Sequence, residues 1–224
     1  YKSALACDPI SAFGGIVSCN FKINKKLALE LNNLFLEVIV GNSFDNEAIK
    51  ILEKKKNLRL IDSTNFKISE NLKLNSSNEE ILVQSEDKKK FTKNDFEIVS
   101  KKKPSKSQFN DLVFAFNICR YVKSNAIVLA ANKTTAGIGS GQPSRLDSCQ
   151  IAIDKMNKFT KPATDIVAAS DAFFPFVDGI EKLVQSGVKA VIQPAGSIRD
   201  KEIIQFANHT GTSLVFSKTR HFRH

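Results

Sequence analysis

The segment Lys123–Arg145, K-S-N-A-I-V-L-A-A-N-K-T-T-A-G-I-G-S-G-Q-P-S-R, indicates the fold class of this chain. Its apolar runs Ala126–Ala131 and Thr134–Ile138 are separated by two polar residues, a pattern typical of a β-hairpin. Three alternating glycines follow, and helical spacing of apolar residues comes after them. We therefore expect a hairpin, a glycine turn and a helix that begins near Pro143 or Ser144, because proline and serine are both favoured there.

The glycine turn has two interpretations. Gly137, Gly139 and Gly141 would let backbone amides approach a ligand, and a helix N-terminus attracts anions. Arg145 would add a planar cationic fork suited to phosphate or carboxylate. Alternatively, the glycines form only a tight turn between a strand and a helix. No Gly-Lys-Ser/Thr follows, so this is not a Walker loop, and the spacing departs from the dinucleotide fingerprint.

The composition limits the classes of partner. The chain has 224 residues, 42% of them hydrophobic, and a net charge of +10. That length allows one large domain or two small ones. The basic excess lies largely in the runs Lys54–Lys56, Lys88–Lys90 and Lys101–Lys103, without the interleaved arginines and aromatics of nucleic-acid grooves. We expect no nucleic-acid partner, and a basic α/β RNA-binding module remains the alternative.

Targeting signals and cysteines point to a protein of a reducing compartment. No apolar run is long enough to cross a bilayer, and no signal peptide is recognisable, so we expect no membrane partner. The chain starts without methionine in a helical pattern, which is typical of a fragment of a longer protein. The four cysteines show no C-x-x-C spacing, and histidines are few. We therefore expect free, buried thiols, a cytoplasmic location and no zinc.

Alternating strand and helix patterns predict an α/β fold. In the first part we expect the helices Ile23–Leu34 and Phe44–Leu52, the strands Phe35–Gly41, Leu58–Ile61, Ile81–Gln84 and Phe96–Ser100, and a surface loop at Asp62–Glu80. In the second part we expect the helices Phe109–Val122, Arg145–Lys158, Asp178–Ser186 and Asp200–His209, and the strands Asp165–Ser170, Lys189–Gln193 and Ser213–Phe216. Lys101–Ser107 is the best boundary, with Ser107 as a helix cap. We expect domains 1–104 and 105–224 and a mixed sheet between helices.

Three predicted strands of the second part are followed by unusual loops. Ser170–Gly179 carries three phenylalanines, which line either a core or a pocket because their exposure is costly. Pro194–Asp200 is a helix entry with backbone amides, and the last strand is followed by S-K-T-R-H-F-R-H. Functional residues of open α/β sheets gather beyond the carboxyl ends of strands. Aromatic walls, amides and arginines together suit a planar, anionic, heteroaromatic ligand.

These motifs resemble those of a known family. S-D-A-F-F-P-F-x-D-G, Q-P-x-G-S-I-R-D, R-H-F-R-H, K-S-N-A-I-V, G-I-G-x-G-Q-x-S-R and D-P-x-S-A-F-G-G-I occur in the order found in the bifunctional purine biosynthesis protein family. That family joins an IMP cyclohydrolase domain to an AICAR transformylase domain. The resemblance covers nearly the whole chain and identifies it as similar to the C-terminal part of the transformylase domain.

The resemblance implies a fold, a reaction and partners. The implied fold is two cytidine-deaminase-like three-layer α/β units with mixed sheets, the first truncated at its N-terminus. The implied activity is that of an AICAR formyltransferase, which transfers a formyl group from 10-formyltetrahydrofolate to AICAR and gives FAICAR in de novo IMP biosynthesis. The resemblance also implies a homodimer with active sites at the subunit interface. It leaves open a monovalent cation near Asp171.

The resemblance also implies site residues, position by position. The AICAR-binding set is Gly14, Glu37, Asn125, Arg145 and Arg220, and the folate-binding set is Leu146, Phe173, Asp178, Ser197 and Ile198. Within these sets, Arg145 and Arg220 would hold negative charge, Asn125 would hydrogen-bond the base, and the Phe173 loop would line the pterin. His224 would add to the polar network.

One departure from the family pattern concerns catalysis. The catalytic Lys-His pair of the family lies upstream of Tyr1, as does the cyclohydrolase domain, so the resemblance supplies no catalytic residue here. The amine of AICAR is a weak nucleophile, and loss of its proton acceptor should cost orders of magnitude in rate. We therefore expect the chain alone to be nearly inactive.

Overall fold

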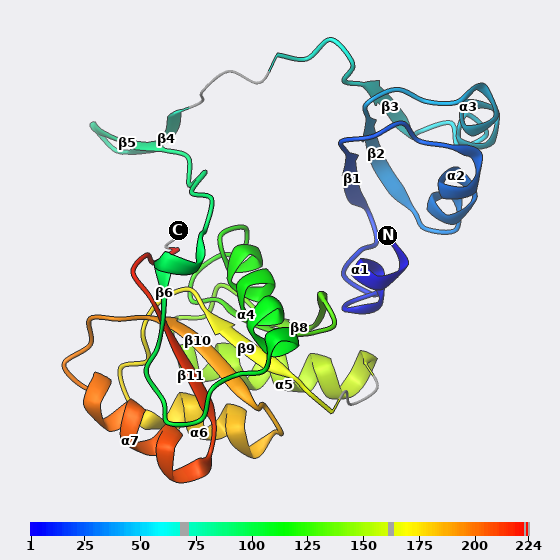
Figure 1. Cartoon of the computed structure of the whole chain (residues 1–224). Helices are drawn as coiled ribbons and strands as arrows, with labels where there is room; N and C mark the ends of the chain where they lie inside the picture. Colours follow the sequence, from blue (N-terminus) through cyan, green and yellow to red (C-terminus); the bar gives the residue numbers. More distant parts are fainter. Residues whose placement is uncertain (68–71, 161–163, 222, 224) are drawn as a thin grey trace. The chain divides into compact units, whose positions relative to one another are not determined.

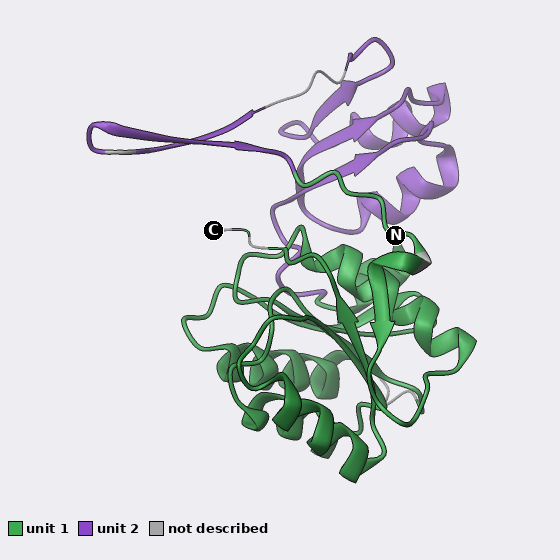
Figure 2. Cartoon of the chain, turned by 60° about the vertical axis from the view of Figure 1, so that its left-hand side comes forward, with its two compact units in different colours: residues 1–8, 87–224 green, residues 9–86 purple. Residues whose placement is uncertain are grey.

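The computed structural model describes residues 1–67, 72–160, 164–221 and 223. It contains two compact units, one of Tyr1–Asp8 with Asp87–His224 and one of Pro9–Glu86 (Figure 2). The first unit takes in the stretch before Lys106, because β6 (Phe96–Ile98) pairs with β11 (Ser213–Ser217) at the end of the chain. The boundaries of these compact units thus differ from the domain boundary expected between residues 104 and 105. Whether 1–104 and 105–224 are related subdomains stays a prediction.

The larger unit is built on a mixed sheet, as predicted, and this sheet has six strands. Its strands run in the order β6-β11-β10-β9-β7-β8 (Figure 1), with β7 at Ile127–Ala131, β8 at Thr134–Gly139, β9 at Val167–Ser170 and β10 at Ala190–Pro194. β9, β10 and β11 are mutually parallel, whereas β6, β7 and β8 each pair antiparallel with a neighbour. The carboxyl ends of β9, β10 and β11 therefore meet at one edge, where β7 begins.

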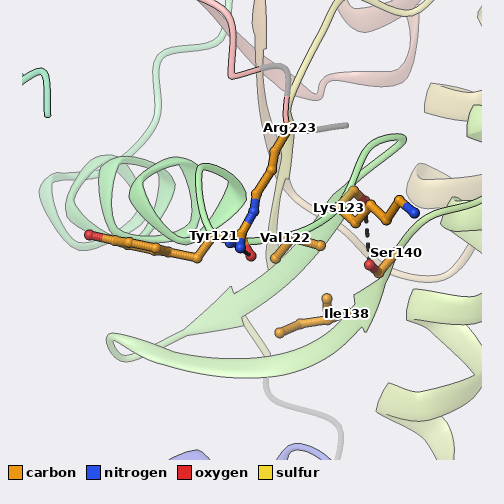
Figure 3. A pocket seen from close by; sticks show the side chains of 6 residues that line it. All are labelled: Tyr121, Val122, Lys123, Ile138, Ser140 and Arg223. Atoms are coloured by element: carbon orange, nitrogen blue, oxygen red, sulfur yellow. Dashed lines mark hydrogen bonds between the residues drawn. The ribbon is translucent and has the colours of Figure 1, made fainter. Parts of the chain in front are cut away.

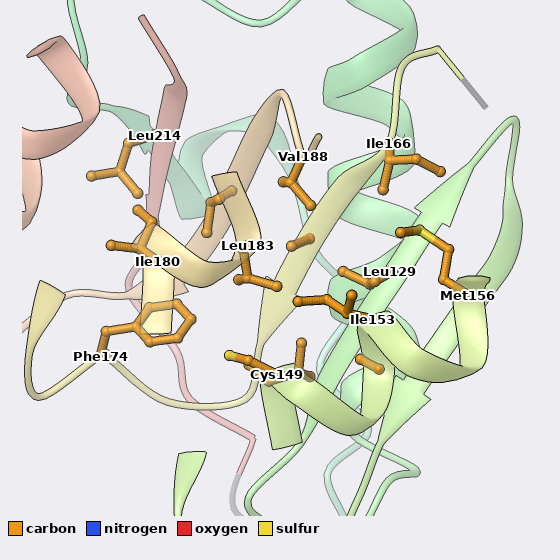
Figure 4. Close-up of a cluster of buried hydrophobic side chains, with 14 of the residues drawn as sticks. Leu129, Cys149, Ile153, Met156, Ile166, Phe174, Ile180, Leu183, Val188 and Leu214 are labelled. Atoms are coloured by element: carbon orange, nitrogen blue, oxygen red, sulfur yellow. The ribbon is translucent and has the colours of Figure 1, made fainter. Parts of the chain in front are cut away.

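Helices cover both faces of this sheet. On one face α4 (Lys106–Cys119) buries Leu112 and Phe116 against strand residues such as Val128. On the other face lie α5 (Arg145–Phe159), α6 (Val177–Gln185) and α7 (Asp200–Thr210), and Figure 4 shows the apolar cluster between them and the sheet. α1 (Lys2–Ala6) belongs to the same unit and contacts β8. α4 begins after Ser105 in a capping box with Gln108, and not after Ser107 as predicted.

The β7–β8 hairpin is confirmed, but its glycines differ from the expected turn. Asn132 and Lys133 form the hairpin turn with φ of 52° and 53°, and the buried Asp111 accepts hydrogen bonds from both of their amides. Gly137 and Gly139 lie within β8. A Cβ at Gly137 would stand 2.0 Å from the carbonyl oxygen of Ala152, and a Cβ at Gly139 would stand 1.9 Å from that of Ser148. Both carbonyls belong to α5. These two glycines therefore serve the close packing of β8 on α5, and only the third, Gly141, has a positive φ.

The smaller unit contains a parallel sheet in the order β1-β2-β3. The strands are β1 at Gly15–Cys19, β2 at Leu36–Gly41 and β3 at Arg59–Asp62, and the helices α2 (Lys25–Asn32) and α3 (Asn46–Leu52) pack on one face. A separate hairpin joins β4 (Leu72–Ser77) to β5 (Glu80–Ser85). The prediction of a loop at Asp62–Glu80 was wrong for β4, because two leucines among polar residues are a weak strand signal.

The cysteines agree with the expectation of free thiols. All four are free, and Cys7, Cys119 and Cys149 are buried. Burial raises the pKa of Cys149 to about 12, so this thiol stays protonated and packs as a small apolar group. Within the described ranges, no helix has the length and hydropathy needed to cross a bilayer.

Candidate functional site

A cavity of about 510 Å³ lies at the edge of the large sheet where β9 and β11 end and β7 begins. Its lining comes from Asn125, from residues 143–146, from residues 172–176 and 178–179, and from the segment after β11. Six of the ten residues expected at the site line it: Asn125, Arg145 and Arg220 of the AICAR set, and Leu146, Phe173 and Asp178 of the folate set. The cavity stands where the rule for open α/β sheets places a ligand.

Arg145 is the first residue of α5 and makes a buried ion pair with Asp171. Its Nη1 also donates to Oγ of Ser170 at 2.9 Å, and its Nη2 donates to Oδ1 of Asn125 at 2.7 Å. Arg145 was expected to hold the charge of a ligand. In the structure its charge is compensated by Asp171, and its guanidinium fixes the orientation of Asn125.

Asn125 is consequently held from several sides. Its Nδ2 donates to the backbone carbonyls of Gln142 and Pro143 at 2.9 and 3.0 Å, and its backbone carbonyl accepts from Ser148 Oγ at 2.8 Å. Because Oδ1 faces a guanidinium and Nδ2 faces two carbonyls, the network admits one orientation of the amide. Asn125 thus forms a rigid polar rim of the cavity.

Asp171 is the residue near which the resemblance left open a monovalent cation. It is completely buried, and one carboxylate oxygen pairs with Arg145 while the other accepts from Ser124 Oγ. A carboxylate that is already neutralised by a guanidinium is a poor ligand for a cation. The described residues also contain no cluster of three or more side chains of the types that ligate metals. A monovalent cation can also be held by carbonyl and hydroxyl oxygens, so a cation near Asp171 stays a prediction.

The three phenylalanines of the loop after β9 all line the cavity, and one of them also belongs to the core. Phe174 is 1% exposed and packs in the apolar cluster under α6, against Gly179. Phe173 and Phe176 line the cavity, and the guanidinium of Arg199 lies 4.9 Å from the ring centre of Phe176. The sequence could not decide between core and pocket, and the structure uses both.

Four expected site residues are not brought to this cavity. Gly14, with φ of +72°, and Glu37 lie in the smaller unit, near each other, where a Cβ at Gly14 would stand 3.9 Å from Glu37 Oε1. Ser197 and Ile198 lie in the turn before α7, and Ile198 is fully exposed. His224, expected in the polar network, is outside the described residues.

Sequence reasoning missed a pair beside the cavity. The ring of His221 is buried, and its Nδ1 is hydrogen-bonded to the carboxylate of Asp87, far away in the sequence. The motif R-H-F-R-H drew attention to Arg220 and His224 but not to His221, and nothing in the lysine-rich stretch around Asp87 marked that carboxylate. Another cavity, of about 570 Å³, is lined by residues such as Tyr121 and Arg223 but by none of the expected site residues (Figure 3).

Comparison with known proteins agrees with the resemblance. A family model described as AICARFT/IMPCHase bienzyme matches residues 1–155. The whole chain is 45% identical to the bifunctional purine biosynthesis protein PurH of Persephonella marina and 45% identical to that of Fusobacterium nucleatum. It is 46% identical to that of Petrotoga mobilis. The chain spans about 44% of the length of these relatives. The match over more than half of its residues shows that the chain belongs to the AICARFT/IMPCHase bienzyme family.

Proposed function

We propose that this chain carries the ligand-binding cavity of an AICAR formyltransferase. In the proposed reaction, the formyl group of 10-formyltetrahydrofolate passes to the amine of AICAR and gives FAICAR. The relatives are named bifunctional purine biosynthesis proteins, and the matching family model is named for both activities. The polypeptide that carries the chain would then also be an IMP cyclohydrolase and act in the cytoplasm.

The observation that carries the proposal is the convergence of six residues from separate motifs on one cavity. Phe173 offers an aromatic face against which a pterin can stack. Asn125 offers an amide that its neighbours hold in one orientation, as recognition of a carboxamide requires. Arg220 supplies a cationic fork on the same cavity, suited to the phosphate of a nucleotide. Arg145 supports the site by orienting Asn125.

A proton acceptor for the amine must come from elsewhere. Among the described residues that line the cavity, none is a lysine or a histidine. A positioned general base typically contributes about 10²–10⁴-fold to the rate. We propose that this base is supplied by residues outside Tyr1–His224, and that the chain alone binds ligands poorly and turns over negligibly.

Two finer points belong to the same proposal. The larger and the smaller sheet would represent two cytidine-deaminase-like units, and two copies of the polypeptide would associate so that each site is completed at their interface. Gly14 and Glu37 would then contact AICAR although they lie in the smaller unit. Ser197 and Ile198 would contact folate in the complete site.

Calorimetric titration of AICAR and of a folate analogue tests the proposal. Titrations would use Tyr1–His224 and the longest natural polypeptide that carries it. Arg220→Ala should weaken AICAR binding about tenfold or more, because a charge-assisted hydrogen bond contributes about 1.5–3 kcal/mol. Phe173→Ala should weaken binding of the folate analogue and leave AICAR nearly unchanged.

Arg59→Ala is the matched control, because this arginine is exposed in β3 and was not expected at the site. It should leave both affinities unchanged. If neither AICAR nor the folate analogue binds, even to the longer polypeptide, the proposal is refuted. Salt-dependent binding of RNA in its place would favour the basic RNA-binding module.

A further inference from the structure

The segment that carries Arg220 is anchored on both sides of this residue. On one side Thr219 Oγ1 accepts from Lys89 Nζ at 2.7 Å. On the other side the amide of His221 donates to the carbonyl of Asp171 at 3.0 Å, and its ring binds Asp87. Farther along, the carbonyl of Arg223 accepts from the Ser124 amide at 2.8 Å. An arginine at the cavity rim is thus held by its two chain neighbours.

The ring of His221 fills a slot between two aromatic side chains. Its centre lies 4.5 Å from the ring of Phe116 on α4 and 5.4 Å from the ring of Phe91, which it meets edge-on. The side chain of His221 is fully buried, whereas that of Asp87 is 38% exposed. Burial lowers the pKa of His221, and the nearby Asp87 opposes this shift. A neutral imidazole that donates from Nδ1 to the carboxylate is therefore the form that suits the slot.

The partner segment is itself fastened to the end of α4. Arg120, the residue that ends this helix, donates to the carbonyls of Asp87 and Lys89 at 3.3 and 2.7 Å. Its guanidinium also lies 5.3 Å from the ring centre of Phe91. In Figure 3 the side chain of Arg223 reaches Tyr121, just after α4, and its Nη1 donates to that carbonyl at 2.7 Å. The rigid helix α4 thus supports both the 87–89 segment and the end of the chain.

We propose that Asp87 and His221 are positioning residues, which clasp the segment after β11 and so place Arg220 at the cavity for an anionic group of the substrate. This inference rests on the proposed function. An arginine side chain has many rotamers, and a segment outside helices and strands is poorly ordered unless it is tied down. Ordering the segment before binding removes a cost that binding would otherwise bear.

The side chains of His221 and Asp87 combine packing with a hydrogen bond, and substitutions can separate these two contributions. The imidazole both fills the aromatic slot and donates a hydrogen bond. Leucine at position 221 would fill the slot and leave Asp87 without its donor. At position 87, asparagine would keep an acceptor for Nδ1–H, whereas alanine would remove it. Because Asp87 is partly exposed, its substitution leaves the core intact, so Asp87→Ala is the main test variant.

The first measurement follows the order of the chain end without any ligand. We expect trypsin to cleave after Lys218, Arg220 and Arg223 faster when this segment opens. Asp87→Ala and His221→Leu should speed cleavage at these sites at least fivefold, as followed by mass spectrometry. Asp87→Asn should cleave at nearly the wild-type rate. His209→Leu, at an exposed histidine of α7, is the matched control and should change nothing.

The second measurement is the affinity for AICAR in the longest natural polypeptide that carries the chain. Asp87→Ala should weaken it about fivefold, the size expected when one long side chain must be ordered on binding, while the affinity for a folate analogue stays the same. Asp87→Asn should restore most of the loss. In the Arg220→Ala background, Asp87→Ala should have no further effect, because both act through the same guanidinium.

The outcomes separate this inference from the proposed function. Unchanged cleavage in Asp87→Ala and His221→Leu would overturn the clasp. Faster cleavage with additive losses of affinity would overturn positioning of Arg220. If AICAR binds but Arg220→Ala leaves its affinity unchanged, positioning for the substrate is overturned while AICAR binding stands. If AICAR does not bind at all, the proposed function fails, and the proteolysis result alone decides whether the clasp exists.

Discussion

Arg145 and Arg220 line the same cavity, yet their surroundings differ in kind. Arg145 is buried at the start of α5, and its guanidinium pairs with Asp171 and donates hydrogen bonds to Ser170 and Asn125. Arg220 is exposed and lies on a segment held by its neighbours in the chain. The sequence motifs assigned both arginines to the charge of a ligand. The comparison teaches that one arginine lining such a cavity can be part of the framework, whereas the other is the one we propose for the ligand.

The largest expected effect concerns the framework arginine. Arg145→Ala would leave the carboxylate of Asp171 buried without its compensating charge. Removing one partner of a buried ion pair costs about 3–5 kcal/mol. We expect the free energy of unfolding, measured with urea, to fall by this amount.

A double variant controls for the size of the lost side chain. Arg145→Ala with Asp171→Ala strands no charge, so its cost should be clearly smaller than the sum of the two single substitutions. Purely additive costs would show that the two residues act independently. Arg145 would then differ less from Arg220 than the geometry indicates.

The next effect tests whether the glycines belong to the same rigid framework. A Cβ at Gly139 would stand 1.9 Å from the carbonyl oxygen of Ser148, one turn into α5. Gly139→Ala should therefore push α5 from β8 and lower the free energy of unfolding by about 3 kcal/mol. Gly141→Ala, which meets only the side chain of Lys123, should cost about 1–2 kcal/mol through its positive φ. Equal effects of the two substitutions would contradict the packing explanation.

Regular secondary structure and the edge of the sheet that holds the cavity could be predicted from the sequence. The hairpin and the helices α5, α6 and α7 lie within a few residues of their predicted bounds, because their apolar residues follow the period of each structure. The edge at which the cavity forms was also predictable, since strand ends of a parallel sheet meet there.

Long-range pairing was not predictable. His221 and Asp87 are 134 residues apart, and neither has a local pattern that names the other. The same holds for Arg145 and Asp171, which meet only because β7, β9 and α5 are neighbours in the fold. A single sequence shows which charges exist but not which of them cancel. The glycines of β8 mislead for a related reason, because close packing of a helix and close approach of a ligand demand the same residue.

A smaller effect on stability is expected at the other arginine. Arg220→Ala should change the free energy of unfolding by no more than about 0.5 kcal/mol, as is usual for exposed positions. The loss of AICAR affinity expected for the same variant would then be a loss of binding and not of fold. A destabilisation as large as that of Arg145→Ala would erase the distinction between the two arginines.

The smallest effect is a dependence on pH in the segment that carries Arg220. Burial lowers the pKa of His221 from its ordinary 6.5, with Asp87 and Asp171 opposing the shift and Arg120 adding to it. The unfolded chain therefore binds the proton more readily than the folded one. The contribution of the neutral ring to stability is complete above pH 6.5 and is lost as the pH falls below that value.

Tryptic cleavage after Lys218 should accordingly speed up between pH 7 and pH 5.5, with each rate normalised to that of a peptide substrate. His221→Leu, which cannot take up a proton there, should show no such acceleration. Parallel pH profiles of the two proteins would mean that the charge of the His221 ring plays no part in holding the segment that carries Arg220.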